Sequence, residues 1–309
     1  MAVSEDVRAE LLRGLSPEAQ EVVTSDARRL LVIAGAGAGK TEAMARRIAW
    51  WHAHDGVPKD HIVAFTFTER AAEEMKFRIR KYIQIAGGES DTDPSLGGMY
   101  VGTIHGFCLN TLRRLWPDEY HNDDVIDDVA RYSLIQEGYH HLLGLQGLEK
   151  ALQESGRQYS QSRTIGYFLQ AYDLLNEYDR LDVELPPEPR PEFGAEKEWC
   201  KQARLLTQVG EGAVAEAFAR SAARYYAYLR CRRFLDFSTV QSELTRRLRA
   251  DDAALSRLRA SITHLVIDEV QDINPVQDEI RRLLIGDRDG RLTAVGDHRQ
   301  AIYGWRGGR

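Results

Sequence analysis

The chain has 309 residues, of which 43% are hydrophobic and 28% charged, and its formal net charge is −6. This composition is typical of a soluble globular protein and excludes disordered and fibrous classes, while the length predicts two domains or one large one. Three cysteines without CxxC spacing exclude a secreted disulfide framework. The start of the chain does not resemble a signal peptide and no long apolar stretch follows, which predicts a cytoplasmic protein without a membrane span.

Strands and helices alternate over the first 110 or so residues. The strand candidates are apolar runs rich in β-branched and aromatic residues, and the helix candidates between them carry apolar residues at helical spacing. The strands are expected at 30–34, 61–67 and 100–103, and the helices at 41–52, 69–85 and 105–115. This alternation favours a parallel sheet covered by helices.

The pattern changes between about Trp116 and Phe234, where helical periodicity dominates and a Pro-rich acidic stretch at 185–198 indicates an exposed connection. Strand signals return at 263–267 and 292–296, and Asn274–Pro275 suits the start of the helix between them. We therefore predict an α/β fold that is split in sequence by a mostly helical insertion. Its parts are the first segment of the α/β domain at 1–115, the insertion at 116–234 and the second segment at 235–309.

A glycine-rich loop between the first strand and its helix carries the strongest chemical signal. The sequence AGAGAGKT from Ala34 to Thr41 fits a phosphate-binding loop, with Ala34 in place of the first glycine. Lys40 would reach the β- and γ-phosphates of ATP, and Thr41 would ligate Mg²⁺. The alternative is a glycine-rich turn with a surface lysine, but the flanking strand and helix favour nucleotide binding. The backbone that would surround the phosphates belongs to Gly35, Ala36, Gly37, Ala38 and Gly39.

The second signal is an apolar strand that ends in two carboxylates, Leu265-Val-Ile-Asp268-Glu269. In a nucleotide site Asp268 would hold Mg²⁺, and Glu269 would orient and deprotonate the attacking water. An apolar strand followed by two acids is common by itself and often has no such role. The glycine-rich loop earlier in the chain favours the catalytic interpretation.

Seven motifs in order give the chain a family resemblance. They are LSPEAQ near Gln20, AGAGAGKT, AFTFTERAAEEM from Ala64, VGTIHGFC from Val101, LDF at Leu235, VIDEVQD from Val266 and VGDHRQAIYGWRGG from Val295. Together they resemble superfamily-one DNA helicases of the UvrD/Rep/PcrA type. The resemblance implies a RecA-like P-loop NTPase domain, whereas the helical middle matches only in its placement.

The resemblance also implies roles for individual residues. Gln20 would contact the adenine, and Gln300 would contact the γ-phosphate and sense its hydrolysis. Aromatic side chains bind single-stranded DNA because every base offers a π-face on which they can stack. By resemblance, Phe67, Tyr303 and Trp305 would stack on bases, and Thr103 and His105 would line the path of the strand.

Alternatives stay open for several of these residues. Phe67 also fits a core position at a strand end, and His105 also fits a bond to a backbone group. The basic residues of the helix candidate at 69–85 form either a solvated face or a set of phosphate contacts. These basic residues are Arg70, Lys76, Arg78, Arg80 and Lys81.

The resemblance implies the ATP-binding N-terminal portion of a 3′-to-5′ DNA helicase or translocase, with ATP and Mg²⁺ as cofactors. Single-stranded DNA and duplex junctions would be its partners. A second RecA-like domain, with its arginine fingers, is absent from the 309 residues, so we expect the isolated chain to hydrolyse ATP poorly. The motor portion of a helicase–nuclease of the AddA/RecB/Adn type and a non-catalytic DNA-binding or docking module are the alternatives.

Overall fold

The computed structural model describes the protein over residues 5–35, 37–87, 96–156, 158–177, 212–286 and 290–297. These residues form two compact units: unit 1 draws on 1–108 and 247–309, and unit 2 on 109–246. The boundaries predicted at 115/116 and 234/235 stay a prediction about domains. None of the helices within the described ranges is both long and apolar enough to cross a membrane.

Unit 1 contains a sheet of five parallel strands in the order β1-β7-β6-β2-β3. The parallel sheet and its helices confirm the predicted α/β class. The strands are β1 Arg29–Ile33, β2 Ile62–Thr66, β3 Tyr100–Thr103, β6 His264–Ile267 and β7 Arg291–Gly296. The helices wholly within this unit are α1 Glu5–Leu12, α2 Pro17–Thr24, α3 Lys40–Ala53, α4 Glu69–Gly87, α13 Asp252–Ala260 and α14 Pro275–Leu284, with the short 3-10 helices η1 Lys59–His61 and η3 Val270–Asp272.

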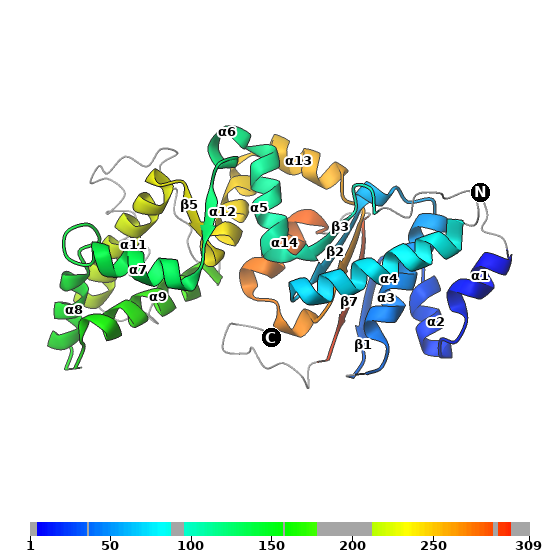
Figure 1. The fold of residues 1–309 in the computed structure, drawn as a ribbon, viewed down its shortest axis with the longest axis horizontal. Coiled ribbons are helices and arrows are strands. Elements are labelled where there is room, and N and C mark those ends of the chain that lie inside the picture. Colours follow the sequence, from blue (N-terminus) through cyan, green and yellow to red (C-terminus); the bar gives the residue numbers. More distant parts are fainter. Residues whose placement is uncertain are drawn as a thin grey trace. The chain divides into compact units, whose positions relative to one another are not determined.

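Helices cover both faces of this sheet (Figure 1), as an all-parallel sheet requires. Figure 1 shows α3 and α4 on one side of the strands and α14 on the other. Ile62 and Ala64 of β2 belong to the core that includes Met44 of α3. Phe65, the residue after Ala64, points to the opposite face and packs edge-on against Phe107 at a ring distance of 5.1 Å. The two faces of β2 are thus used by different helices, which explains its continuous apolar run, whereas the edge strand β1 leaves Leu31 and Ile33 exposed.

Unit 2 is mostly helical, as the sequence predicts for the insertion. It also contains a two-stranded parallel ladder, β4 with β5, that the sequence analysis did not anticipate. Its elements are α6 Pro117–Tyr120, β4 Asp124–Ile126, α7 Asp128–Gly138, α8 Leu145–Glu154, α9 Gln161–Glu177, α11 Ala213–Cys231 and β5 Phe234–Asp236. Helices α5 Ile104–Leu115 and α12 Phe237–Ala250 each contain a boundary between the units.

A buried ionic cluster holds four elements of unit 2 together, and we call it the Arg131 network. Arg131 is 3% exposed; its Nη2 lies 2.7 Å from Asp173 Oδ1 and its Nε lies 3.3 Å from Asp236 Oδ2. The Tyr225 hydroxyl donates to Asp236 Oδ2 at 3.0 Å. Asp236 also accepts from the Thr239 backbone N–H at 2.8 Å. The network therefore links α7, α9, α11 and the start of α12.

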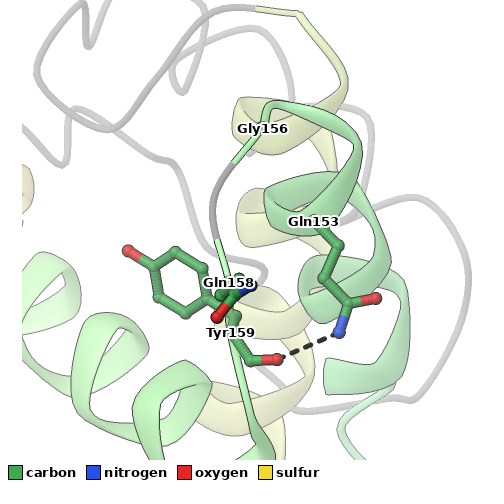
Figure 2. Close-up of a pocket in the computed structure, with 4 residues that line it drawn as sticks. All are labelled: Gln153, Gly156, Gln158 and Tyr159. Carbon is green, nitrogen blue, oxygen red and sulfur yellow. Dashed lines mark hydrogen bonds between the residues drawn. The ribbon is translucent and has the colours of Figure 1, made fainter.

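Unit 2 also has a surface hollow of about 570 Å³ between the end of α8 and the start of α9. Figure 2 shows its four lining residues, Gln153, Gly156, Gln158 and Tyr159. The Gln153 side-chain amide donates to the Tyr159 carbonyl at 3.0 Å, so the glutamine fixes the wall of the hollow. The described lining residues offer amide, hydroxyl and backbone groups for hydrogen bonds.

Candidate functional site

The candidate site lies at the carboxyl ends of the strands of unit 1, where ligands commonly bind in parallel sheets. The glycine-rich loop follows β1, and Asp268 and Glu269 follow β6. Strands β1 and β6 both pair with β7, which brings these segments to the same edge of the sheet. The loop also contacts β7 directly, because the Ala34 N–H donates to the Gly296 carbonyl at 3.2 Å.

The glycine-rich loop has the backbone shape that its glycines permit. Gly37 and Gly39 have φ angles of 76° and 77°, the left-handed region that favours glycine. Added Cβ atoms at both positions would meet no heavy atom within 4 Å, so the loop is uncrowded around these two glycines. Helix α3 begins at Lys40 without a side-chain hydrogen bond at its N-cap, Gly39. Its first turn therefore offers backbone N–H groups and the positive end of a helix dipole to an anion.

Lys40 and Glu269, 229 residues apart, form an ion pair in which Lys40 Nζ lies 3.1 Å from Glu269 Oε2. The side chain of Lys40 is 9% exposed and that of Glu269 is 32% exposed. Glu269 has φ 52° and ψ 49°, a strained left-handed conformation for a residue with a side chain. Strain of this kind is concentrated at functional sites, where the surrounding structure enforces it.

Asp268 is more deeply buried than Glu269. It is 9% exposed, and its Oδ1 accepts the Glu269 backbone N–H at 3.1 Å. Burial, and then the neighbouring Glu269 carboxylate, raise the pKa of Asp268 to about 6, against the lowering effects of that N–H and of Lys40. The carboxylates of Asp268 and Glu269 thus have one nearby ammonium group, that of Lys40. A divalent cation would neutralise the remaining negative charge.

Gln271 and Asp297 join this site although the sequence analysis did not single them out. The Gln271 side chain donates to Glu269 Oε2 at 2.9 Å and accepts from the Asp297 N–H at 3.0 Å. A Cβ added at Gly35 of the loop would lie 3.9 Å from Asp297 Oδ2. Both residues lie inside motifs already quoted, VIDEVQD and VGDHRQAIYGWRGG. The two motifs could therefore have drawn attention to Gln271 and Asp297. They could not reveal the hydrogen bond between these residues, which are 26 positions apart.

The three described residues predicted to contact DNA follow the next two strands of the same sheet. Phe67 comes directly after β2 and is 42% exposed, so it does not fill the core. The Thr103 hydroxyl at the end of β3 donates to Glu69 Oε1 at 2.8 Å and accepts the Gly106 N–H at 3.2 Å. Thr103 thus caps α5, and His105, half-buried, lies in its first turn.

The structure places the other predicted residues as follows, except for those outside the described ranges. The Gln20 side chain donates to the Leu15 carbonyl at 3.0 Å, next to its own helix α2. Thr41 is the second residue of α3. On α4, Lys76 pairs with Glu73 and Arg78 with Glu74, so part of the basic face is neutralised by its own helix. Ala36, Gln300, Tyr303 and Trp305 lie outside the described residues.

Comparison with known proteins identifies the family. The model of the UvrD/REP helicase N-terminal domain matches residues 15–309. The chain belongs to this family. It is 29% identical to DNA helicase II of Haemophilus influenzae, over 97% of this chain and 36% of that protein. It is 30% identical to DNA helicase II of Escherichia coli, over 96% of this chain and 35% of that protein. It is 28% identical to ATP-dependent DNA helicase Rep of Escherichia coli, over 96% of this chain and 37% of that protein.

The chain therefore spans about a third of the length of the curated relatives that it matches. Family membership agrees with the resemblance drawn from the motifs, and it makes the chain a counterpart of the N-terminal part of a helicase motor.

Proposed function

We propose that this chain is the ATP-binding N-terminal part of an ATP-dependent DNA helicase that moves 3′ to 5′ along single-stranded DNA. The observation that carries the proposal is the ion pair of Lys40 with Glu269 beside an open glycine-rich loop. Nucleotide and DNA binding are proposed for this chain. Hydrolysis-driven translocation and unwinding are proposed for the whole protein, because the matched relatives are about three times as long.

The residues fit MgATP in kind and in charge. The open loop and the uncapped start of α3 offer backbone N–H donors to phosphate oxygens. Thr41 and Asp268 would hold Mg²⁺, which supplies charge neutralisation of the phosphates when it is bound. The excess negative charge at Asp268 and Glu269 over Lys40 supports a cation there.

Glu269 is the proposed general base. Lys40 would leave its ion pair to neutralise the phosphates, which frees the Glu269 carboxylate to accept a proton from the attacking water. The water oxygen would bond to the γ-phosphorus as the bond from that phosphorus to the bridging oxygen breaks, giving ADP and phosphate. Gln300 and Gln20 keep their proposed roles at the γ-phosphate and at the adenine.

Nucleotide binding is tested by thermal unfolding with and without MgATP. We expect a ligand-dependent rise in Tm for the wild type, because a ligand that binds only the folded state stabilises it. Lys40→Ala should abolish the rise, whereas Lys150→Ala, an exposed lysine of unit 2, should preserve it. An equal rise in Lys40→Ala would contradict the role of Lys40. DNA binding without any MgATP effect in the wild type would favour the non-catalytic module.

DNA binding is tested with two exposed phenylalanines of unit 1. Phe67 is 42% exposed at the end of β2, and Phe77 is 70% exposed on α4. If Phe67 stacks on a base, Phe67→Ala should weaken binding of a fluorescent single-stranded oligonucleotide by roughly 5- to 100-fold, or ~1–3 kcal/mol. Phe77→Ala should leave the affinity at the same salt concentration unchanged. Equal affinities for both variants would remove Phe67 from the DNA site.

A further inference from the structure

Gln271 occupies a position between the two strands that carry the candidate site. It lies in η3, just after Asp268 and Glu269, and is 6% exposed. Its Oε1 accepts the Asp297 N–H at 3.0 Å, while its Nε2 donates to Glu269 Oε2 at 2.9 Å and to Asp272 Oδ2 at 3.2 Å. One side-chain amide therefore connects the carboxylate after β6 to the backbone at the end of β7.

This connection begins where the ladder between the two strands stops. The paired positions of β6 and β7 end at Ile267 with Ala294, three residues before Asp297. Beyond that point the Gln271 side chain supplies the link. Because an amide has both an acceptor and donors, it can bond a backbone N–H and a carboxylate at once, which a carboxylate or an ammonium side chain at this position could not do.

The chain leaves space for this side chain at Gly296. A Cβ at Gly296 would collide with Gln271 Oε1, and it would lie 3.0 Å from Val270 Cγ1 and 3.2 Å from the Val270 backbone nitrogen. The φ angle of Gly296 is not in the left-handed region, so close approach rather than backbone freedom requires glycine here. The close packing of Gln271 against Gly296 therefore fixes the position of the glutamine side chain.

Glu269 Oε2 has two donors within the described residues, Lys40 Nζ and Gln271 Nε2. If Lys40 turns to the phosphates, as the proposed function requires, Gln271 stays as the donor that holds this oxygen. Its hydrogen bond to Oε2 leaves Oε1 to accept the proton from water. A neutral donor does this without the charge that would make the carboxylate a weaker base.

We propose that Gln271 is a positioning residue for ATP hydrolysis, which holds the Glu269 carboxylate in its strained conformation against the end of β7. This inference rests on the proposed function of Glu269 as general base. Gln271 touches neither the nucleotide nor the water in this proposal and acts through Glu269. Its loss should therefore slow the chemical step and leave nucleotide affinity unchanged.

The test is single-turnover hydrolysis of radiolabelled ATP with the chain in excess, which measures even slow chemistry. Gln271→Met keeps the length of the side chain and removes both kinds of hydrogen bond. We expect its rate constant to fall about 10- to 100-fold, as for other residues that orient a catalytic group, with a Kd for MgATP within about threefold of wild type by thermal shift. Gln153→Met is the matched control, since Gln153 also bridges through its amide but lies in unit 2, and its rate should not change.

Two further variants separate positioning from general damage. Gly296→Ala leaves Gln271 unchanged but forces it out of place, so it should slow hydrolysis in the same way. In a Glu269→Gln background, Gln271→Met should cause no further loss, because the group that it positions is already inactive. An unchanged rate in Gln271→Met, or a full additional loss in the double variant, would overturn the inference.

The outcomes also separate this inference from the proposed function. Wild-type protein that shows no Lys40-dependent response to MgATP would defeat the proposed function itself. Wild-type protein that binds and hydrolyses ATP, is slowed by Glu269→Gln and is indifferent to Gln271→Met would defeat only the role of Gln271.

Discussion

The candidate site of unit 1 and the Arg131 network of unit 2 both contain buried charges, but they balance them differently. In the Arg131 network one guanidinium pairs with three carboxylates, those of Asp128, Asp173 and Asp236. A tyrosine and a backbone N–H complete the hydrogen bonds of Asp236. Burial alone would lower the pKa of Arg131, but Asp236 and Asp173 together raise it. The charged form of the arginine is therefore stabilised by neighbours that the fold itself provides, although burial still raises the pKa of Asp173.

At the candidate site the balance is incomplete. The pKa of Asp268 is raised to about 6 because burial and Glu269 outweigh the help from Lys40. Glu269 is strained, and the loop beside it is open. The Arg131 network thus stabilises the fold of unit 2, whereas the candidate site carries negative charge that its own residues leave unbalanced.

The largest expected effect comes from breaking the completed network. Arg131→Met should lower the free energy of unfolding by about 3–5 kcal/mol, because it leaves the fully buried Asp236 and the part-buried Asp173 without their cation. Urea denaturation followed by circular dichroism measures this loss. Arg220→Met, an exposed arginine on α11 of the same unit, should change stability by less than about 0.5 kcal/mol. A similar small change in Arg131→Met would remove the distinction between the two regions.

A change at the incomplete site should have the opposite sign. Asp268→Asn keeps an acceptor for the Glu269 N–H but removes the buried charge. In the absence of divalent cations we expect it to stabilise the chain at pH 7, on the order of 1–3 kcal/mol. The gain follows from linkage: the folded-state pKa of about 6 exceeds the ordinary value of 3.8, so wild-type stability falls as pH rises between these values.

The pH dependence identifies the cause of that gain. The advantage of Asp268→Asn should be absent below about pH 4, grow between pH 4 and 6 and level off above pH 6. Asp60→Asn, an exposed acid of unit 1, should show no such dependence. A destabilised Asp268→Asn, or a gain that does not vary with pH, would mean that burial of this carboxylate carries no cost.

Local patterns in the sequence predicted much of unit 1. Its inner strands are apolar runs because both of their faces are covered. The strands β1, β2, β3, β6 and β7 all lie within a residue or two of the predicted ranges. Asn274 caps α14 with a reciprocal hydrogen-bond pair to Gln277, as the Asn-Pro signal indicated. The motifs marked the glycine-rich loop and the acid pair, and the structure places them after β1 and β6.

Other features depend on contacts between distant residues and could not be read from local patterns. Asp173 lies 42 residues from Arg131, and nothing in either neighbourhood marks them as partners. The ladder of β4 with β5 uses strands of three residues each, too short to show a period. The Gln271 link became visible only when the fold placed η3 beside the end of β7.

The smallest effect on stability should come from a single methyl group in the open loop. Gly37→Ala forces a left-handed residue but meets no heavy atom within 4 Å. We expect a loss of about 1 kcal/mol, since the backbone cost of roughly 1–2 kcal/mol is partly offset by a less flexible unfolded chain. The rise in Tm with MgATP should shrink far more than this loss implies, because the strained backbone belongs to the loop whose N–H groups are proposed to bind phosphate.

Gly147→Ala is the matched control in unit 2. Gly147 lies within α8, also with no heavy atom within 4 Å of an added Cβ, and its φ angle is not left-handed. Alanine there should stabilise the chain by about 0.5–1 kcal/mol, since it favours a helix over glycine. Opposite signs for two equally uncrowded glycines would show that the loop glycine is retained for its backbone and for a ligand. If Gly37→Ala stabilises the chain and leaves the response to MgATP intact, the loop is an ordinary turn. The candidate site would then not differ from the Arg131 network in being built for a ligand.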